Sequence, residues 1–110
     1  MTVCGTVGGK SLDARTGRIL KTIPQVGDAD EVWYDSGSNR YYFAHSTAGA
    51  AEAPSARSGA IGVVDGTTDA FVTDIPIEGA GVHSVAVNAR NKHIFVPVAG
   101  RGILVVTLGQ

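Results

Sequence analysis

An internal repeat constrains the fold of this chain more than any other feature of its sequence. The segment ADEVWYDSGSNRYYFAHS (29–46) aligns with VHSVAVNARNKHIFVPVA (82–99) at a constant offset of 53 residues. A second pair, LDARTGRILKTIP (12–24) and VDGTTDAFVTDIP (64–76), aligns at an offset of 52. Because self-similarity at a fixed period is the signature of repeat architectures, we predict that the chain consists of copies of one supersecondary unit.

The size of this unit follows from a third similarity. GILVVT (102–107) resembles AIGVVD (60–65) at an offset of 42, so the basic unit has about 42 residues. The larger offsets arise because the segment Ser46–Gly59 is roughly ten residues longer than its counterpart near Ala99–Gly102. The longer segment is rich in Ala, Ser and Gly, which predicts a solvent-facing, mobile insertion.

Each unit contains four short runs of β-branched or aromatic residues, which predict four strands. In the middle unit these runs are Val32–Asp35, Arg40–His45, Ile61–Asp65 and Ala70–Ile75. The runs are almost continuously apolar, as in strands that are buried on both faces. The tight turns between them begin with Asp and contain Gly, so we expect Asp to accept backbone hydrogen bonds and Gly to supply positive φ. Four strands in about 42 residues favour an all-β, β-propeller-like fold of antiparallel meanders.

These motifs resemble the YVTN-type repeat of bacterial β-propeller proteins. The matching residues are Val64–Thr68, Ile75-Pro76, Gly79, His83–Val87 and Ile94–Pro97. The resemblance covers nearly the whole chain and implies a fold rather than a chemistry, because propellers have many activities. Proteins of this family are often periplasmic or surface-located, whereas the segment MTVCGTVGGKSLD lacks the basic start and apolar run of a signal peptide. The sequence therefore does not indicate one cellular location.

Aligned to the repeat, the chain is expected to be a single domain, 1–110, of about two and a half units: a partial one at 1–26, a complete one at 29–77 and a partial one at 82–110. Propellers typically have at least four blades, so this chain cannot close a ring alone. It is a piece of a longer protein, or copies associate, or the strands form a smaller sandwich. We expect a homo-oligomer, with a dimer favoured. The faces to be buried are lined by Val85, Val87, Phe95 and Val105.

Composition narrows the classes of partner. The net charge is −1 and acidic and basic residues are mixed along the chain, so no basic stripe is available for nucleic acid. The sequence has no apolar run near the roughly 18 residues of a membrane span. A single cysteine, Cys4, allows neither an internal disulfide nor a zinc cluster of cysteines.

In a propeller, the loops that join successive blades and the loops between the second and third strands of each blade lie on one face. The resemblance implies that ligands bind on this face. The candidate ligand-binding residues are Asp30, Glu31, His45, His83 and Arg101. Asp30 and His83 occupy the same repeat position, so we expect them to lie near each other. Asp30, Glu31 and His83 are also candidate ligands for a divalent cation. The alternative is that these are solvated loop residues, or that His83 bonds to backbone at a strand start.

The sequence predicts no catalytic residues. Ser84 and His83 are neighbours on an extended segment, so their side chains point to opposite faces and do not form a dyad. The leading hypothesis is a non-enzymatic binding or scaffold module, without an obligatory cofactor, that presents its loop face to a protein or small ligand. A second hypothesis is a metal-assisted hydrolase or lyase subunit that uses the acidic and His cluster. A third is a structural fragment without independent activity.

Overall fold

The computed structural model describes residues 1–4, 7–47, 58–77 and 82–108. Within these ranges the chain is all-β, with three antiparallel sheets and a 3₁₀ helix, η2 (Pro24–Val26). In each sheet, strands that follow one another in sequence lie side by side. Among the described residues there is no helix with the length and hydropathy needed to cross a membrane.

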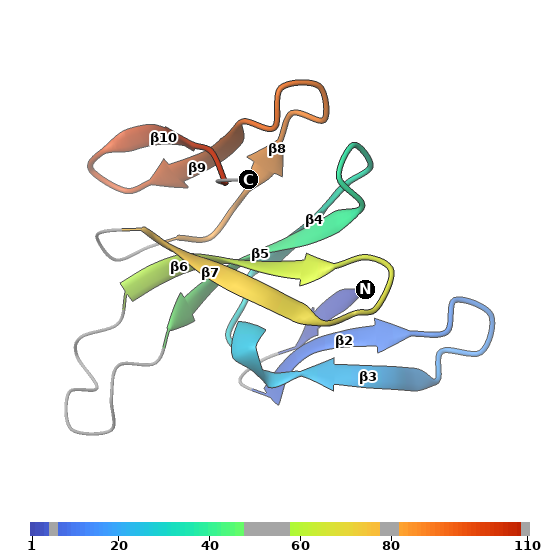
Figure 1. Cartoon of the computed structure of the whole chain (residues 1–110). Coiled ribbons are helices and arrows are strands. Elements are labelled where there is room, and N and C mark those ends of the chain that lie inside the picture. Colours follow the sequence, from blue (N-terminus) through green and yellow to red (C-terminus); the bar gives the residue numbers. More distant parts are fainter. Residues whose placement is uncertain (5–6, 48–57, 78–81, 109–110) are drawn as a thin grey trace.

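The three sheets follow one another along the chain (Figure 1). The N-terminal sheet has the order β1 (Thr2–Cys4), β2 (Gly8–Leu12), β3 (Ile19–Ile23). The central sheet has the order β4 (Glu31–Asp35), β5 (Arg40–Thr47), β6 (Ser58–Asp65), β7 (Phe71–Ile77). The C-terminal sheet consists of β8 (Ala86–Val87), β9 (Ile94–Val98) and β10 (Gly102–Val106).

The strands agree with those predicted from the repeat. The central sheet is a four-stranded antiparallel meander, and its strand ends differ from the predicted ones by no more than three residues. The β5–β6 pairing continues through Ser46↔Gly59 and Thr47↔Ser58. The ends of the expected insertion Ser46–Gly59 are therefore paired strand residues, and the rest of that segment, 48–57, lies outside the described residues.

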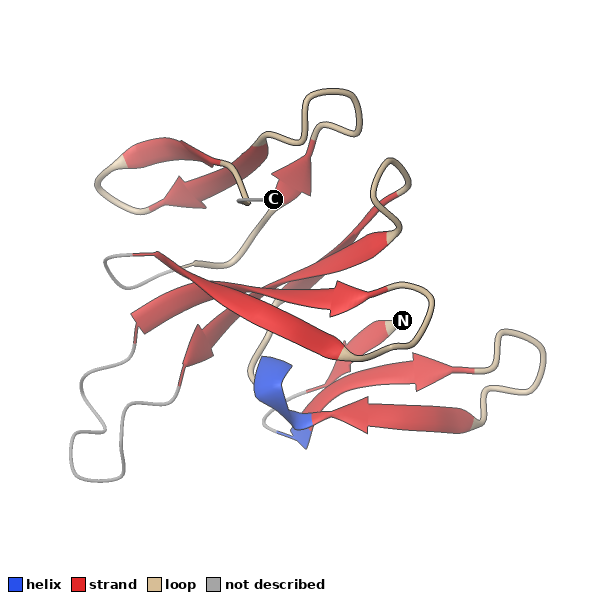
Figure 2. Ribbon diagram, in the orientation of Figure 1, coloured by secondary structure: helices blue, strands red, loops and turns tan. Residues whose placement is uncertain are grey.

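The sheets are stacked, with the central sheet between the other two (Figures 1 and 2). One core cluster joins the N-terminal and central sheets and contains Ile23, Val26, Ala29, Phe43 and Val64. The other joins the central and C-terminal sheets and contains Tyr42, Ala44, Ile61, Val63, Ile77, Val82, Val85, Val87, Ile94, Val96 and Val98. Because consecutive residues Tyr42 and Phe43 point into different clusters, β5 is buried on both faces, as its continuous apolar run predicts.

One expectation about the exposed faces is wrong. Val85 and Val87 are buried in the cluster between the central and C-terminal sheets and do not line an open face. The open face of the C-terminal sheet presents Val105, as predicted, and also Ile103, which are 53% and 65% exposed. Only the side chains of alternate residues point the same way, and a continuous apolar run does not indicate which set points outward.

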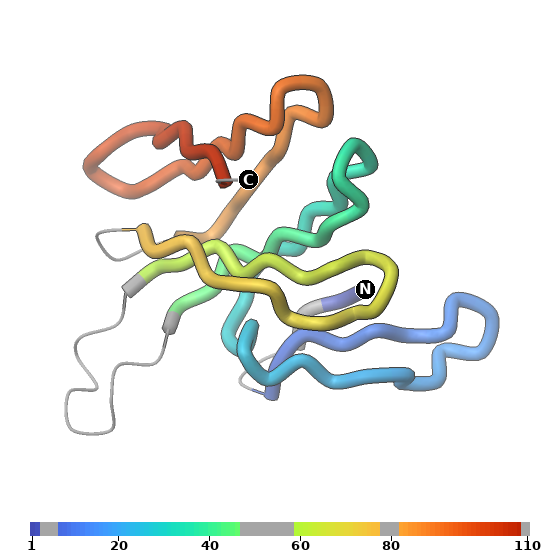
Figure 3. The backbone as a smooth tube through the Cα atoms, viewed as in Figure 1, coloured from blue at the N-terminus to red at the C-terminus, as the bar shows by residue number. Residues whose placement is uncertain are grey.

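Four tight turns lie on the same side of the molecule (Figure 3). Each begins with an Asp or Asn whose side-chain oxygen accepts backbone N–H bonds from the residues that follow: Asp13, Asp35, Asp65 and Asn88. For example, Asp65 Oδ1 accepts from the Thr67 N–H at 2.8 Å and from the Thr68 N–H at 2.9 Å. The expectation for Asp at the turn starts is confirmed.

The expectation for glycine holds at one of these turns. Gly17 has φ of 75°, but the equivalent residues in the other turns are Asn39, Asp69 and Lys92, with φ of 53°, 56° and 64°. Gly66 serves a different purpose, because a Cβ there would lie 2.3 Å from Asn39 Oδ1. Glycine at this turn therefore permits close approach of the neighbouring turn rather than a left-handed backbone.

Candidate functional site

The stacking of the sheets brings Asp30 and His83 together on the side opposite the tight turns. Asp30 directly precedes β4, where its N–H donates to the Ala44 carbonyl at 3.0 Å, and His83 precedes β8. His83 Nδ1 lies 2.5 Å from Asp30 Oδ2. Both side chains are exposed, at 71% for His83 and 57% for Asp30, so the pair lies at the surface. The shared repeat position predicts this proximity.

Glu31 holds the segment that follows His83 by hydrogen bonds that are separate from the Asp30–His83 contact. Its Oε1 accepts a hydrogen bond from Ser84 Oγ at 3.1 Å and another from the Val85 N–H at 3.0 Å. These bonds join the edge of the central sheet to the segment that enters β8. Glu31 therefore orients His83, the preceding residue, and its carboxylate is already bonded to protein groups.

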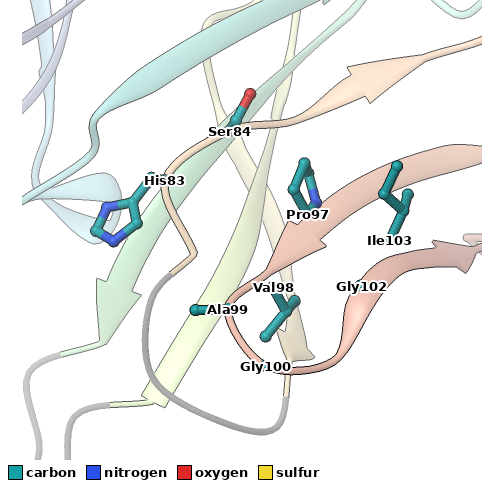
Figure 4. A pocket seen from close by; sticks show the side chains of 8 residues that line it. All are labelled: His83, Ser84, Pro97, Val98, Ala99, Gly100, Gly102 and Ile103. Carbon is teal, nitrogen blue, oxygen red and sulfur yellow. The ribbon is translucent and has the colours of Figure 1, made fainter.

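A surface hollow of about 460 Å³ lies beside His83 (Figure 4). It is lined by His83, Ser84, Pro97, Val98, Ala99, Gly100, Gly102 and Ile103. His83 and Ser84 are the lining residues with polar side chains, but in Figure 4 the imidazole and the hydroxyl point away from the other lining side chains, so most of the wall is apolar. The hollow thus combines the end of β9, the β9–β10 turn and the start of β10 with the segment before β8.

The β9–β10 turn gives the hollow its shape. Gly100 and Gly102 have φ of 77° and 87°, a conformation that residues with a Cβ rarely adopt. Arg101 is an exposed residue of this turn, and its N–H donates to the Val98 carbonyl at 3.0 Å. Arg101 is a predicted site residue but is not among the residues that line the hollow, whereas Pro97, Val98 and Ile103 line it and were not predicted. The available signal was the pair of glycines that flanks Arg101.

His45 does not join these residues. It lies within β5, is 2% exposed and points toward the N-terminal sheet, where its Nε2 lies 2.6 Å from Asp74 Oδ1 on β7. Gly62 on the intervening strand leaves room for this contact, since a Cβ there would lie 3.2 Å from both of these atoms, closer than most Cβ contacts. His45 is therefore a buried, partnered histidine rather than a residue of the loop surface.

The described residues contain no group of three or more His, Cys, Asp or Glu side chains arranged to hold a metal ion. Asp30 and His83 supply two such groups, and the nearby Glu31 carboxylate is bonded to Ser84 and Val85. The cation site at these residues stays a prediction.

The carboxyls with shifted pKa lie on the side of the tight turns. Burial of Asp35 raises the pKa of its carboxyl, but hydrogen bonds from Ser38 and Gly37 and the charge of Lys92 outweigh this and bring the pKa below its ordinary 3.8. The Asp65 carboxyl has a pKa below 3.8 chiefly because the Thr68 and Thr67 N–H groups donate to it. These carboxyls therefore stabilise turns and are not part of the hollow.

Comparison with known proteins adds no relative. A scan of protein-family models finds no match to this chain, and a search of curated proteins finds no significant similarity. The resemblance to the YVTN-type repeat thus rests on the repeat residues themselves.

Proposed function

We propose that the chain is a set of successive blades of a YVTN-type β-propeller and that it acts as a non-enzymatic binding module. Three observations support the architecture. The strands of every sheet follow one another in meander order, the sheets are stacked face to face, and the turns of successive sheets share one geometry. An incomplete ring of blades is consistent with these observations and with the repeat of about 42 residues.

The observation that carries the binding function is the hollow beside the Asp30–His83 pair. A volume near 460 Å³ suits a small ligand, or a side chain of a partner protein. His83 lies at the rim of the hollow, and since its Nδ1 is bonded to Asp30, its Nε2 is the ring nitrogen left for the polar end of a ligand that reaches this rim. The walls formed by Val98, Ala99 and Ile103 would cover an apolar body. The matching ligand has a compact apolar body and one polar end.

Binding agrees better than catalysis with the bonds at this site. Ser84 Oγ donates to Glu31 and not to His83, so the hydroxyl and the imidazole do not form a nucleophile–base pair. No contact among the described residues specifically favours a metal-assisted reaction. The scaffold supports a site at one edge of the stack, as expected for a module that recognises rather than transforms its ligand.

Nuclear magnetic resonance of the ¹⁵N-labelled chain tests this function with phenol and benzoate as probes, because these rings have similar size and carry a hydrogen-bond donor or an acceptor. We expect saturable shifts confined to the amides of Ser84 and the β9–β10 turn. His83→Ala should weaken binding about two- to tenfold, the effect of one lost hydrogen bond. His93→Ala, on the side of the tight turns, is the matched control and should bind as wild type. Unsaturable shifts, or shifts spread over the tight turns, would contradict the proposed site.

A further inference from the structure

The outward face of the C-terminal sheet repeats a face that is buried in the central sheet. We call this outward face of the C-terminal sheet the leading face. Its residues and their equivalents in the central sheet are Phe95 and Tyr42, Pro97 and Ala44, Ile103 and Ile61, and Val105 and Val63. In the central sheet the C-terminal sheet covers these positions, and all four residues are at most 3% exposed. In the C-terminal sheet Pro97, Ile103 and Val105 are exposed, with Ile103 at 65%, and Phe95 is half-buried.

The N-terminal sheet shows the converse. Its outward face, the trailing face, contains Leu12 and Ile19, which are equivalent to Val64 and Phe71 of the central sheet. Val64 is fully buried in the cluster with the N-terminal sheet, and Phe71 packs against that cluster. Ile19, in contrast, is 53% exposed. The apolar residues of the trailing face thus occupy positions that elsewhere in this chain pack on a preceding sheet.

The two open faces correspond to the two kinds of sheet face that pack against each other inside the chain. Both internal interfaces join the leading side of one sheet to the trailing side of the next, with apolar residues on both sides. The free leading and trailing faces lie on opposite ends of the stack, as Figure 2 shows, so they cannot meet within one chain. A second copy of the chain provides the missing surface for each of them.

We propose that the leading face of one chain packs against the trailing face of a second copy, as successive sheets do within the chain. This contact is heterologous, because two different surfaces meet. In a pair of chains, both faces of each chain are buried when the trailing face of each chain covers the leading face of the other. Since Pro97 and Ile103 belong both to the leading face and to the hollow, the second copy also forms an additional wall of the hollow.

Sedimentation velocity of the full chain over a wide range of concentration tests this proposal. Wild type should approach twice the 11.3 kDa mass of one chain. Ile103→Glu disrupts the leading face and Ile19→Glu the trailing face, and each should raise the apparent Kd at least about tenfold, because association would bury an unpaired carboxylate. Both positions are more than half exposed, so the fold should survive, and circular dichroism checks this. Val72→Glu is the matched control, since Val72 is 45% exposed on β7 and belongs to neither face.

A mixture of the two variants gives the decisive result. Ile103→Glu retains an intact trailing face and Ile19→Glu an intact leading face, so an equimolar mixture should regain two-chain mass that neither variant forms alone. The proposal is overturned by wild type that keeps the mass of one chain at high concentration, by an Ile103→Glu or Ile19→Glu variant that associates like wild type, or by a mixture that does not regain mass. Equal loss of association in Val72→Glu also overturns it, because the contact would then involve the edge of the central sheet. None of these measurements requires a ligand, so they are independent of the proposed binding function.

Discussion

His45 Nε2 and Asp74 Oδ1 lie 2.6 Å apart and meet across β6, the strand that separates β5 from β7. Gly62 on β6 leaves the space through which the two side chains reach each other. The contact fastens three strands of the central sheet on the side that faces the N-terminal sheet. This arrangement makes the stability of the sheet sensitive to changes at any of the three residues.

Asp74→Ala should remove the partner of a buried imidazole. Because His45 is 2% exposed, we expect the loss to lower the free energy of unfolding by about 1–3 kcal/mol. The matched control is Asp30→Ala, which breaks the exposed His83 pair and should lower stability by no more than about 1 kcal/mol. Urea unfolding measures both variants. Equal losses in the two variants would show that burial of His45 does not set the strength of its contact.

Gly62→Ala should overpack the space between the central sheet and η2. A Cβ at this position would lie 2.4 Å from Val26 Cγ1, which belongs to a well-packed core cluster. We expect a loss of about 1–3 kcal/mol, as for other insertions of atoms into a packed core. Thermal unfolding followed by circular dichroism would show this as a lower Tm. An unchanged Tm would mean that Val26 moves aside without cost.

Asp69 should tolerate glycine and reject a β-branched residue. Its φ of 56° is left-handed, so Asp69→Val should cost about 1–2 kcal/mol, whereas Asp69→Gly should retain or slightly raise stability. Denaturant unfolding of the two variants measures the difference. Ala14→Val is a suitable control, because this exposed residue of the equivalent Asp13 turn does not have positive φ and its side chain forms no hydrogen bond. A stability of Asp69→Val equal to that of wild type would contradict the left-handed conformation.

The turn carboxyls should make stability fall in acid. The pKa of Asp35 is lower in the folded chain than the ordinary 3.8, so its contribution is present above that value and is lost as the pH falls through the folded pKa. Asp35→Asn should therefore be less stable than wild type at neutral pH, and the difference should shrink below pH 3.8. Urea unfolding at a series of pH values measures this trend. A constant difference across the series would mean that the charge of Asp35 contributes nothing.

The repeat allowed the strands, their meander order and the approach of Asp30 to His83 to be predicted. These features depend on apolar runs and turn residues that recur at fixed offsets. The contact between His45 and Asp74 could not be predicted in this way, because the equivalent residue Val98 has an apolar side chain and Asp74 lies two strands away from His45. The contact lies beside Gly62, whose missing side chain leaves room for it, and the sequence pattern alone does not relate Gly62 to either residue.

The walls of the hollow and part of the outward face of the C-terminal sheet could not be predicted from the sequence for a related reason. Whether Val85 or Ile103 points outward depends on the register of their strands relative to the neighbouring sheet. An almost continuous apolar run fits either orientation, so the repeat alignment alone did not distinguish them. The structure resolves this by showing Val85 in the core and Ile103 on the surface.

The two interfaces between sheets join equivalent faces, and this gives the fold the energetics of a linear array. Each sheet contacts its sequence neighbours, so stability is approximately a sum of sheet terms and nearest-neighbour interface terms. A substitution at Phe43 should therefore affect the N-terminal and central sheets, while one at Val96 should affect the central and C-terminal sheets. Duplication of one unit would lengthen the stack without requiring a new kind of interface, which makes the number of sheets a quantity that sequence change can alter in whole steps.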